Sequence, residues 1–474
     1  MKKIFILLSV FLNFSFVYAS DEGFSKFLDE VKGGFQEFKN QQDKEFYEYL
    51  KNSWEEFKSF SAIKRDEKPK INKAPVVREN VKLKLDKERV KVVNDINYVN
   101  ENSPEVSEDS QPTKEFLVKD DGLLFYGINL SINPKNYGKL VTLPIKGEKI
   151  AEAWKKLATS DTDILIKQII SNGKKQNFSD WAYFKLVKSI SNFVYSDSYN
   201  DRILFSWFLI SKLGYDVKIG YNSARVFLMV PSKQLIYGAQ FFNFNGVRYY
   251  ILFSDVKNIG SLYSYSGKHS DAEKFFVFDI KDNVKSKFSR RDLSFIYDGK
   301  RYNFEVEYDI FNVTFYNDFP QTDLSVYYNA DVSKHLVNTV VDSMRNLVKG
   351  KSEAEAVNII LRFVQTAFKY KTDQEQFGYE KYFLPDETLH YPYSDCEDRS
   401  ILFSYLVKNI LGLKVVLLEY PGHIATAVRF NDDVGGDRLK IENDIYVICD
   451  PTYINANIGM AMPQFKGVLP KVIF

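Results

Sequence analysis

The segment that most constrains the fold is residues 391–428, which read YPYSDCEDRSILFSYLVKNILGLKVVLLEYPGHIATAV. A Ser-Asp pair precedes Cys396, apolar residues follow it at helical spacing, and Gly412 comes directly after them. This pattern predicts a helix with an N-cap before Cys396 and a C-cap at Gly412. Cys396 then lies in the first turn, where unpaired backbone N–H groups and the positive end of the helix dipole favour a thiolate.

Three strands are predicted after this helix. Residues 415–419 form the first, a Pro-Gly turn follows, and His423 opens the second. The third covers residues 445–449 and ends at Asp450, which is followed by a proline. A nucleophile at a helix end, a base on one strand and an orienting carboxylate on the next is the arrangement of a Cys–His–Asp triad. The candidate catalytic residues are therefore Cys396, His423 and Asp450.

Each of these residues also has a structural interpretation. A lone cysteine is usually a core residue, but Cys396 stands in the polar sequence SDCED at a helix start, which favours the nucleophile. His423 could be an ordinary strand residue, and Asp450 before proline could simply end a strand. In a strand, Cys449 points to the opposite face from Asp450, so it is interpreted as a core thiol and not as a disulfide partner of Cys396.

The segments SDCEDRS, PGHIATAV and CDPTY resemble the nucleophile, histidine and aspartate motifs of the transglutaminase-like superfamily of papain-like cysteine enzymes. The resemblance covers residues 331–474 and includes the order of the three motifs. It implies an α+β papain-like core, with the nucleophile helix packed on an antiparallel sheet, and attack on amide bonds through a thioester. It does not fix the substrate, because members include peptidases, amidases, protein cross-linkers and inactive relatives; we favour a peptidase or amidase.

The resemblance also implies an oxyanion site formed by the Cys396 N–H and an upstream side-chain donor. Tyr391 is the candidate donor, in place of the Trp or Gln of the family. Tyr393 recurs in an upstream repeat and is interpreted as structural. Asp398 is a tentative oxyanion or substrate contact, although an ion pair with Arg399 that steadies the helix start is the preferred interpretation.

Residues 195–230 repeat, without gaps, the pattern of the segment that holds the candidate cysteine and histidine. Both segments contain YSD, ILFS, an LG helix end and strand valines, which predicts an internal duplication. Ser198 aligns with Cys396 and Arg225 with His423, so the first copy lacks both the thiol and the titrating base. The upstream copy is therefore predicted to be a structural repeat without activity.

The predicted order of domains is the inactive copy at 120–272, a β-rich connection with an Asp-Gly hairpin turn at 273–330, and the catalytic domain at 331–474. Residues 369–391 form an insertion that the first copy lacks. Its aromatic and acidic residues suit a wall of the substrate cleft, and a plain packed excursion is the alternative. Strands are also expected at 123–132 and 274–280, and helices at 148–157, 161–171, 180–194 and 331–349.

Residues 1–19 have the charged start, apolar middle and small-residue end of a secretory signal peptide. The product is expected in the periplasm, at the cell surface or secreted, with no transmembrane segment in the mature chain. Within residues 20–60, apolar side chains over 24–60 recur at three- and four-residue spacing, which predicts an amphipathic helix or two helices broken near Gly33 and Gly34. Docking on its own protein and contact with a partner or surface are equally open. The charged residues 61–119 predict a flexible linker.

The remaining patterns exclude several kinds of chemistry. A net charge of +2 gives no indication of nucleic-acid binding. No phosphate loop, dinucleotide motif or metal-ligand spacing is present, so no cofactor or metal is expected. The acidic segment 431–444 is interpreted as a solvated hairpin tip and not as a calcium site. Two functions remain: an exported cysteine hydrolase or acyltransferase acting on a protein or cell-wall peptide, and a non-catalytic envelope binding or scaffold protein.

Overall fold

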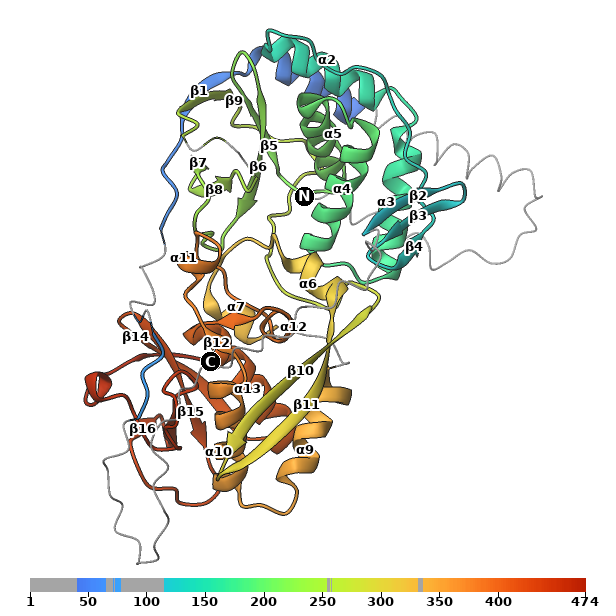
Figure 1. Ribbon diagram of the computed structural model, residues 1–474. Coiled ribbons are helices and arrows are strands. Elements are labelled where there is room, and N and C mark those ends of the chain that lie inside the picture. The colour runs from blue at the N-terminus through green and yellow to red at the C-terminus, as the bar shows by residue number, and fades with distance from the viewer. Residues whose placement is uncertain are drawn as a thin grey trace, which may run out of the picture.

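The computed structural model describes residues 41–64, 71, 73–77, 115–253, 256, 258–330 and 336–474, without the side chains of residues 337 and 338. The expected signal peptide and most of the expected linker lie outside this part of the chain. The described chain has a mixed α+β structure whose large sheets are antiparallel. Figure 1 shows the first half, coloured blue to green, above the second half, coloured orange to red.

The first half combines four helices with a six-stranded sheet. The helices agree with the three expected ones and with the expected helix of the repeat, because each buries an apolar stripe: α2 (Gly147–Ala158), α3 (Thr162–Lys175), α4 (Asp180–Val194) and α5 (Tyr199–Lys212). The strand order in the sheet is β1-β9-β5-β6-β8-β7. These strands are β1 (Glu55–Lys58), β5 (Lys218–Tyr221), β6 (Val226–Ser232), β7 (Phe241–Phe244), β8 (Val247–Tyr250) and β9 (Ser261–Ser264).

The second half packs α10 (Glu353–Thr366) and α13 (Cys396–Leu411) beside a five-stranded sheet. The strand order is β16-β17-β15-β14-β18. Gly412 ends α13 with a φ of 68°, a left-handed conformation that suits glycine, so the predicted C-cap is confirmed. The strands are β14 (Lys414–Tyr420), β15 (His423–Arg429), β16 (Arg438–Ile441), β17 (Asp444–Cys449) and β18 (Lys471–Ile473).

The two halves share one helix–strand–strand arrangement. In the first half, α5 is followed by the antiparallel pair β5 and β6, in which Tyr221 faces Val226. In the second half, α13 is followed by β14 and β15, in which Glu419 faces Ile424. The ungapped alignment of the two repeat segments pairs these same positions, so the strand register agrees with the repeat.

The third strand departs from that alignment by one residue. Strand β8 pairs with β6 through Tyr250 and Val230, whereas in the second half Val428 of β15 faces Val447 of β17. Val230 aligns with Val428, so their strand partners Tyr250 and Val447 correspond. Counting on from these partners, Phe253 corresponds to Asp450. The first half therefore has a phenylalanine where the second half has the candidate aspartate.

A long hairpin and two short helices connect the halves. Strands β10 (Phe288–Tyr297) and β11 (Lys300–Asp309) pair along their whole length, and Asp298 and Gly299 both have positive φ in the turn, which confirms the expected hairpin. The helices are α6 (Ile310–Tyr316) and α7 (Leu324–Tyr328). The hairpin runs along one side of the second half (Figure 1).

One expectation for this region and its neighbours was wrong, and two were confirmed only in part. Residues 274–280 form no strand, because their backbone is held by single contacts, such as the bond from the Phe276 N–H to the Pro231 carbonyl. The expected strand at 123–132 is split by a turn into β3 (Gly122–Phe125) and β4 (Ile128–Leu130), which form a small sheet with β2 (Phe116–Lys119). The expected helix at 331–349 contains a π-helical turn, η1 (Val337–Val341), before α9 (Asp342–Val348), and residues 331–335 are not described.

The insertion 369–391 is buried in its second half. It contains β12 (Lys369–Tyr370), α11 (Asp373–Gln376) and α12 (Pro385–His390), and it leads into β13 (Tyr393–Ser394). Residues 381–389 are buried, and the Lys381 ammonium forms a buried ion pair with Glu387. Arg291 of β10 donates to the carbonyls of Leu389 and Tyr391. This burial favours the packed excursion, in which the insertion holds the two halves and the hairpin together.

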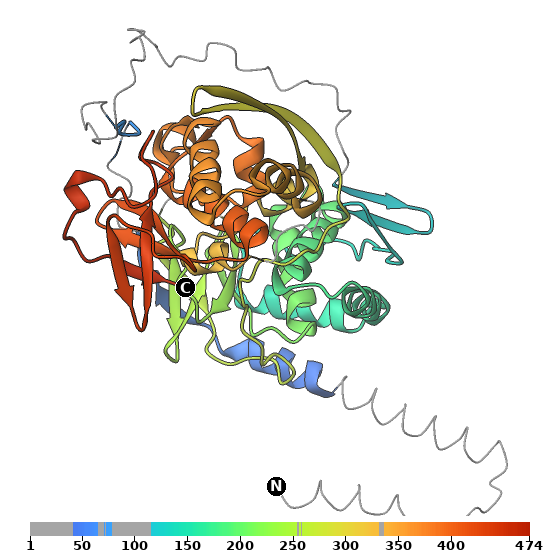
Figure 2. The ribbon, with the colours of Figure 1, turned by 90° about the horizontal axis from the view of Figure 1, so that it is seen from below.

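The amphipathic segment docks on the first half of its own chain where it is described. Residues 41–52 are helical, but the helix does not reach residue 60, because β1 pairs with β9 there. Phe46 and Leu50 are buried, and the Phe46 ring packs edge-on against Trp154 at 4.7 Å. Figure 2 shows this helix, in blue, along the first half. Residues 24–40 lie outside the described residues.

Part of the expected linker is ordered against the second half. Val76 forms a parallel bridge with Ile454, and the Ile454 N–H donates to the Pro75 carbonyl at 2.8 Å. The described residues 73–77 therefore contact the loop that follows Asp450, which a free tether would not do. Among the described residues, no helix is both long enough and apolar enough to cross a membrane.

Asp43 anchors the N-terminal helix to the first half. Its replacement by Asn is expected to lower the free energy of unfolding by about 3 kcal/mol, because the buried Lys212 ammonium loses its charged partner. Both Asp43 oxygens lie 2.9 Å from Lys212 Nζ, and Oδ1 lies 3.0 Å from His269 Nε2. Burial alone would raise the pKa of Asp43, but the His269 hydrogen bond and the Lys212 charge lower it below the usual 3.8.

A lowered pKa in the folded state means that ionised Asp43 stabilises the fold above pH of about 4 and loses this effect as the pH falls. The difference in free energy of unfolding between wild type and Asp43→Asn should therefore be full at pH 7 and shrink below pH of about 4, measured by urea unfolding. The exposed Glu56→Gln in β1 is the control and should change stability by less than about 0.5 kcal/mol. A difference that does not vary with pH would contradict the assignment.

Candidate active site

Helix α13 carries Cys396 into the interior of the protein. Every residue of its first two turns is buried, and Cys396 has an exposed fraction of 0%. The Ser400 hydroxyl donates to the carbonyl of Ile424 at 3.2 Å and so ties the helix to β15. The sequence predicted the helix start at Cys396, and the structure begins α13 at this residue.

His423 and Asp450 are hydrogen-bonded, with His423 Nε2 2.9 Å from Asp450 Oδ2. The other Asp450 oxygen accepts the N–H groups of Thr452, at 2.9 Å, and Tyr453, at 3.2 Å. Gln365 of α10 donates to the Asp450 carbonyl at 3.1 Å. Exposed fractions of 0% for His423 and 2% for Asp450 show that the pair is closed to solvent. These contacts fix the carboxylate, which in turn orients the imidazole.

The Cys396 thiol is engaged by its neighbour Glu397. Its Sγ donates to Glu397 Oε2 at 2.9 Å and accepts the N–H of Ile424, the residue after His423, at 3.4 Å. No hydrogen bond joins Sγ to the His423 ring in the described structure, and His423 Nδ1 has no hydrogen-bond partner among the described residues. The thiol is thus next to the strand that carries the base but is bonded to a carboxylate.

This environment corrects the expectation of a low thiol pKa. Burial raises the pKa of Cys396 well above its usual value of 9.0, and the Glu397 and Asp395 charges raise it further. The helix start favours a thiolate, but two neighbouring carboxylates and the loss of water disfavour it more strongly. Burial also raises the pKa of Cys449, so the two thiols do not differ in the expected direction.

The side chain of Phe465 covers His423. It lies in the short helix η2 (Pro463–Phe465) and stacks on the imidazole with ring centroids 5.2 Å apart and an interplanar angle of 7°. The same ring stacks on Tyr420 at 4.7 Å. Sequence inspection did not single out Phe465, because the loop that carries it has no distinctive motif.

The two tentative positions have other partners. The Tyr391 hydroxyl donates to Asn317 Oδ1 at 3.3 Å, so the expected oxyanion donor is directed to a residue that follows α6. Asp398 accepts the N–H groups of Phe383, at 2.9 Å, and Asp395, at 3.2 Å, and is fully buried. Asp398 therefore holds the loop before α13 and is not free to contact a substrate.

The expected ion pair between Asp398 and Arg399 is also wrong. The Arg399 guanidinium donates to the Ser394 hydroxyl at 3.1 Å and to the carbonyls of Gln365, at 3.3 Å, and Phe368, at 2.9 Å. Burial lowers the pKa of Arg399 to about 10. The arginine uses neutral acceptors to connect the end of α10 to the start of α13.

Tyr370 is a candidate functional residue that the sequence did not reveal. It lies in β12, which pairs in parallel with β13, so Tyr370 is opposite Ser394, just before the helix start. Its hydroxyl is buried and has no hydrogen-bond partner among the described residues. Burial raises the pKa of Tyr370, and charge on Cys396 and Asp395 raises it further. The parallel pairing of two-residue strands leaves no periodic signal in the sequence.

A cluster of acidic side chains surrounds the thiol. Asp395 and Glu397 flank Cys396 in sequence, and Asp373 of the insertion joins them; one ligand atom of each lies within 4.8 Å of the others. All three residues are buried. Burial raises the pKa of Asp395, and the Glu397 charge adds to this effect. The sequence analysis assigned no role to these carboxylates.

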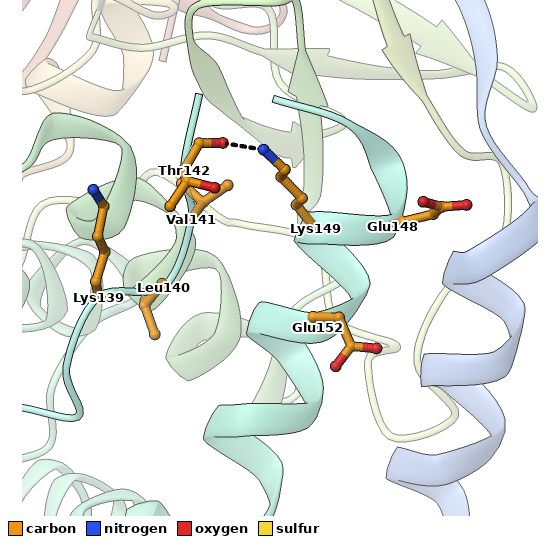
Figure 3. A pocket seen from close by; sticks show the side chains of 7 residues that line it. All are labelled: Lys139, Leu140, Val141, Thr142, Glu148, Lys149 and Glu152. Carbon is orange, nitrogen blue, oxygen red and sulfur yellow. Dashed lines mark hydrogen bonds between the residues drawn. The ribbon is translucent and has the colours of Figure 1, made fainter. Parts of the chain in front are cut away.

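The described part of the first half contains pockets that are lined by none of Cys396, His423 and Asp450. Figure 3 shows one of 340 Å³, lined by Lys139, Leu140, Val141, Thr142, Glu148, Lys149 and Glu152. Its Lys149 donates to the Thr142 carbonyl at 3.0 Å, and Glu152 accepts the Tyr47 hydroxyl, so these polar groups serve the fold. A second pocket, of 150 Å³, lies at the start of α5 and includes Tyr199, Arg202 and Phe253.

No protein-family model matches the chain, and no curated protein matches it. The function is therefore inferred from the site itself.

Replacing Phe465 by Ala is expected to raise the rate of His423 modification by diethylpyrocarbonate about tenfold. The substitution removes a stacked ring, an interaction worth about 1.5 kcal/mol at most, and so favours local opening over the imidazole. The rate is measured by mass spectrometry of the peptide that contains His423. The exposed Gln464→Ala in the same short helix is the control and should leave the rate unchanged; equal rates in wild type and Phe465→Ala would show that another element closes the site.

Proposed function

We propose that this protein is a transglutaminase-like cysteine enzyme that acts on amide bonds through a thioester at Cys396. The observation that carries the proposal is the buried His423–Asp450 pair, at 2.9 Å, whose histidine opens the strand that packs against the helix beginning with Cys396. A base oriented by a carboxylate, beside a cysteine at a helix start, is the constellation that activates a thiol nucleophile.

Catalysis begins with transfer of the Cys396 proton to His423 Nδ1, the ring nitrogen that Asp450 leaves unengaged. The thiolate attacks the amide carbonyl, the C–N bond breaks, and the leaving amine takes the proton from His423. Water then attacks the thioester with His423 as base, which releases the acid and regenerates the thiol. The thiol must first leave Glu397 Oε2, its partner in this structure. Water is the preferred acceptor, which makes the protein a peptidase or amidase.

In this proposal, the Cys396 N–H and the hydroxyl of Tyr370 donate hydrogen bonds to the oxyanion. The support is that the Tyr370 hydroxyl is buried without a partner among the described residues and that Tyr370 pairs with Ser394, two residues before Cys396. The Tyr391 hydroxyl, in contrast, bonds to Asn317. A donor that makes no other hydrogen bond is ready to stabilise negative charge as it develops.

The proposal includes an inactive duplicate of the core in the first half. Ser198, which aligns with Cys396, is the N-cap of α5, and its hydroxyl accepts the Asp201 N–H at 3.3 Å. Arg225, which aligns with His423, lies over the Tyr199 ring at 5.4 Å. With a capping serine, an arginine and Phe253 at the three positions, the first half has no nucleophile–base pair.

The chain is proposed to act outside the cytoplasm, on a protein or cell-wall peptide, because residues 1–19 have the pattern of a signal peptide. A second candidate function is a non-catalytic binding or scaffold protein that retains the fold. The observation that favours it is the complete burial of Cys396 and His423, together with the raised pKa of the thiol.

Turnover by Cys396 distinguishes these functions. The purified chain is incubated with a defined library of glutamine-containing peptides, and products and acyl adducts on Cys396 are followed by mass spectrometry. We expect Cys396→Ala to abolish turnover and Asp450→Asn to lower it by about a thousandfold or more, because the imidazole loses its orienting carboxylate. Cys449→Ala, which removes the other buried thiol, should retain turnover.

Turnover that survives in Cys396→Ala would overturn the triad. The scaffold function would be favoured if neither the folded wild-type chain nor the folded Phe465→Ala variant converts a peptide or forms an adduct on Cys396.

A further inference from the structure

The carboxylates of Asp373, Asp395 and Glu397 converge on one point in the interior. One oxygen from each lies within 4.8 Å of the others, and the three residues have exposed fractions of 2%, 0% and 0%. Two oxygens that bind one Ca²⁺ at about 2.4 Å are at most about 4.8 Å apart, so the spacing suits a shared hard cation. The ligands come from two segments, the insertion and the start of α13.

Three of the six carboxylate oxygens of this cluster are buried without a hydrogen bond among the described residues. Both oxygens of Asp395 and Oε1 of Glu397 are buried without a partner among the described residues. An ionised carboxylate in the interior is strongly disfavoured unless it is hydrogen-bonded, paired or bound to a metal. The missing partners are an observation independent of the clustering, and they point to a positively charged ligand.

The nearby cationic side chains are committed elsewhere. Lys381 pairs with Glu387, and the Arg399 guanidinium donates to Ser394 and to two backbone carbonyls. Among the described residues, no ion pair joins a lysine, arginine or histidine to Asp373, Asp395 or Glu397. No described basic side chain pairs with this cluster, so its free oxygens are available to a cationic ligand.

We propose that Asp373, Asp395 and Glu397 bind a hard divalent cation, of the calcium or magnesium type, in the interior beside Cys396. The donors are carboxylate oxygens, which such cations prefer over softer metals. Asp373 also accepts the Lys381 N–H at 2.7 Å through Oδ2, and Asp398 holds the Asp395 backbone at 3.2 Å, so both ligand segments are fixed. Glu397 supplies Oε1 to the cation while its Oε2 accepts the thiol of Cys396.

The cation site does not depend on catalysis by Cys396, because none of its ligands is a triad residue. It does connect the insertion to the nucleophile helix, since one ligand comes from α11 and two from the start of α13. A bound cation would thus stabilise the packing of the insertion, and its removal would weaken that packing.

The test is calorimetric titration of the full chain, freed of metal with EDTA and then desalted, with CaCl₂, MgCl₂ and ZnCl₂ separately. Wild type is expected to bind CaCl₂ or MgCl₂ at one site and to melt at a higher temperature with it. Asp395→Asn and Glu397→Gln should each weaken binding at least about tenfold. In the metal-free chain, neither substitution should lower the melting temperature, because each changes a buried carboxylate that has an oxygen without a partner among the described residues. An unchanged melting temperature separates lost binding from lost folding.

Two controls make the result specific. Asp432→Asn, in the exposed acidic segment 431–444, should bind the cation like wild type. If Asp432→Asn loses binding and Asp395→Asn keeps it, the cation binds to segment 431–444 and the proposal is overturned. Cys396→Ala should also bind like wild type, which separates the cation site from the proposed enzyme function. Absence of binding to CaCl₂ and MgCl₂, or binding of ZnCl₂ alone, would overturn the proposal.

Discussion

The site depends on the burial of the first turn of α13. This turn takes five consecutive residues, Asp395 to Arg399, out of water, and four of them carry ionisable charge. Burying such groups is unfavourable unless each has a partner, so the surrounding core must supply both packing and hydrogen bonds. Asp398 and Arg399 obtain theirs from backbone groups, whereas Asp395 and Glu397 are left with free oxygens. Stability comes from the core around the turn, and chemistry comes from the groups that the core leaves unpaired.

The same burial explains why thiol and base are held apart. Cys396 is bonded to Glu397, and His423 is bonded to Asp450 and covered by Phe465. In a site without water, a thiol beside two carboxylates keeps its proton, and transfer to the imidazole needs a change in the contacts of Glu397. Proton transfer from the thiol therefore requires Glu397 to leave it. Access to the imidazole requires the loop that carries Phe465 to move.

The two halves share a helix–strand–strand arrangement but differ in what surrounds it. Both place two antiparallel strands in the same register after a helix, but the first half has a pocket at the start of its helix and docks the N-terminal segment through Asp43 and Phe46. The second half has an insertion that places Tyr370 and Asp373 beside the start of α13. The insertion thus accounts for much of the chemical difference between the halves.

Sequence alone determined the local elements: the helix at Cys396 with its glycine C-cap, the strands that begin at His423 and end before Asp450, and the strand register shared with the upstream repeat. These follow from apolar periodicity, capping residues and turns, which are local in the chain. Only the tertiary structure decided the environment of each group. The raised pKa of Cys396, the contacts that occupy Tyr391 and Asp398, and the meeting of Asp373 with Asp395 and Glu397 arise from burial and from contacts between distant segments, which leave no local pattern in a sequence.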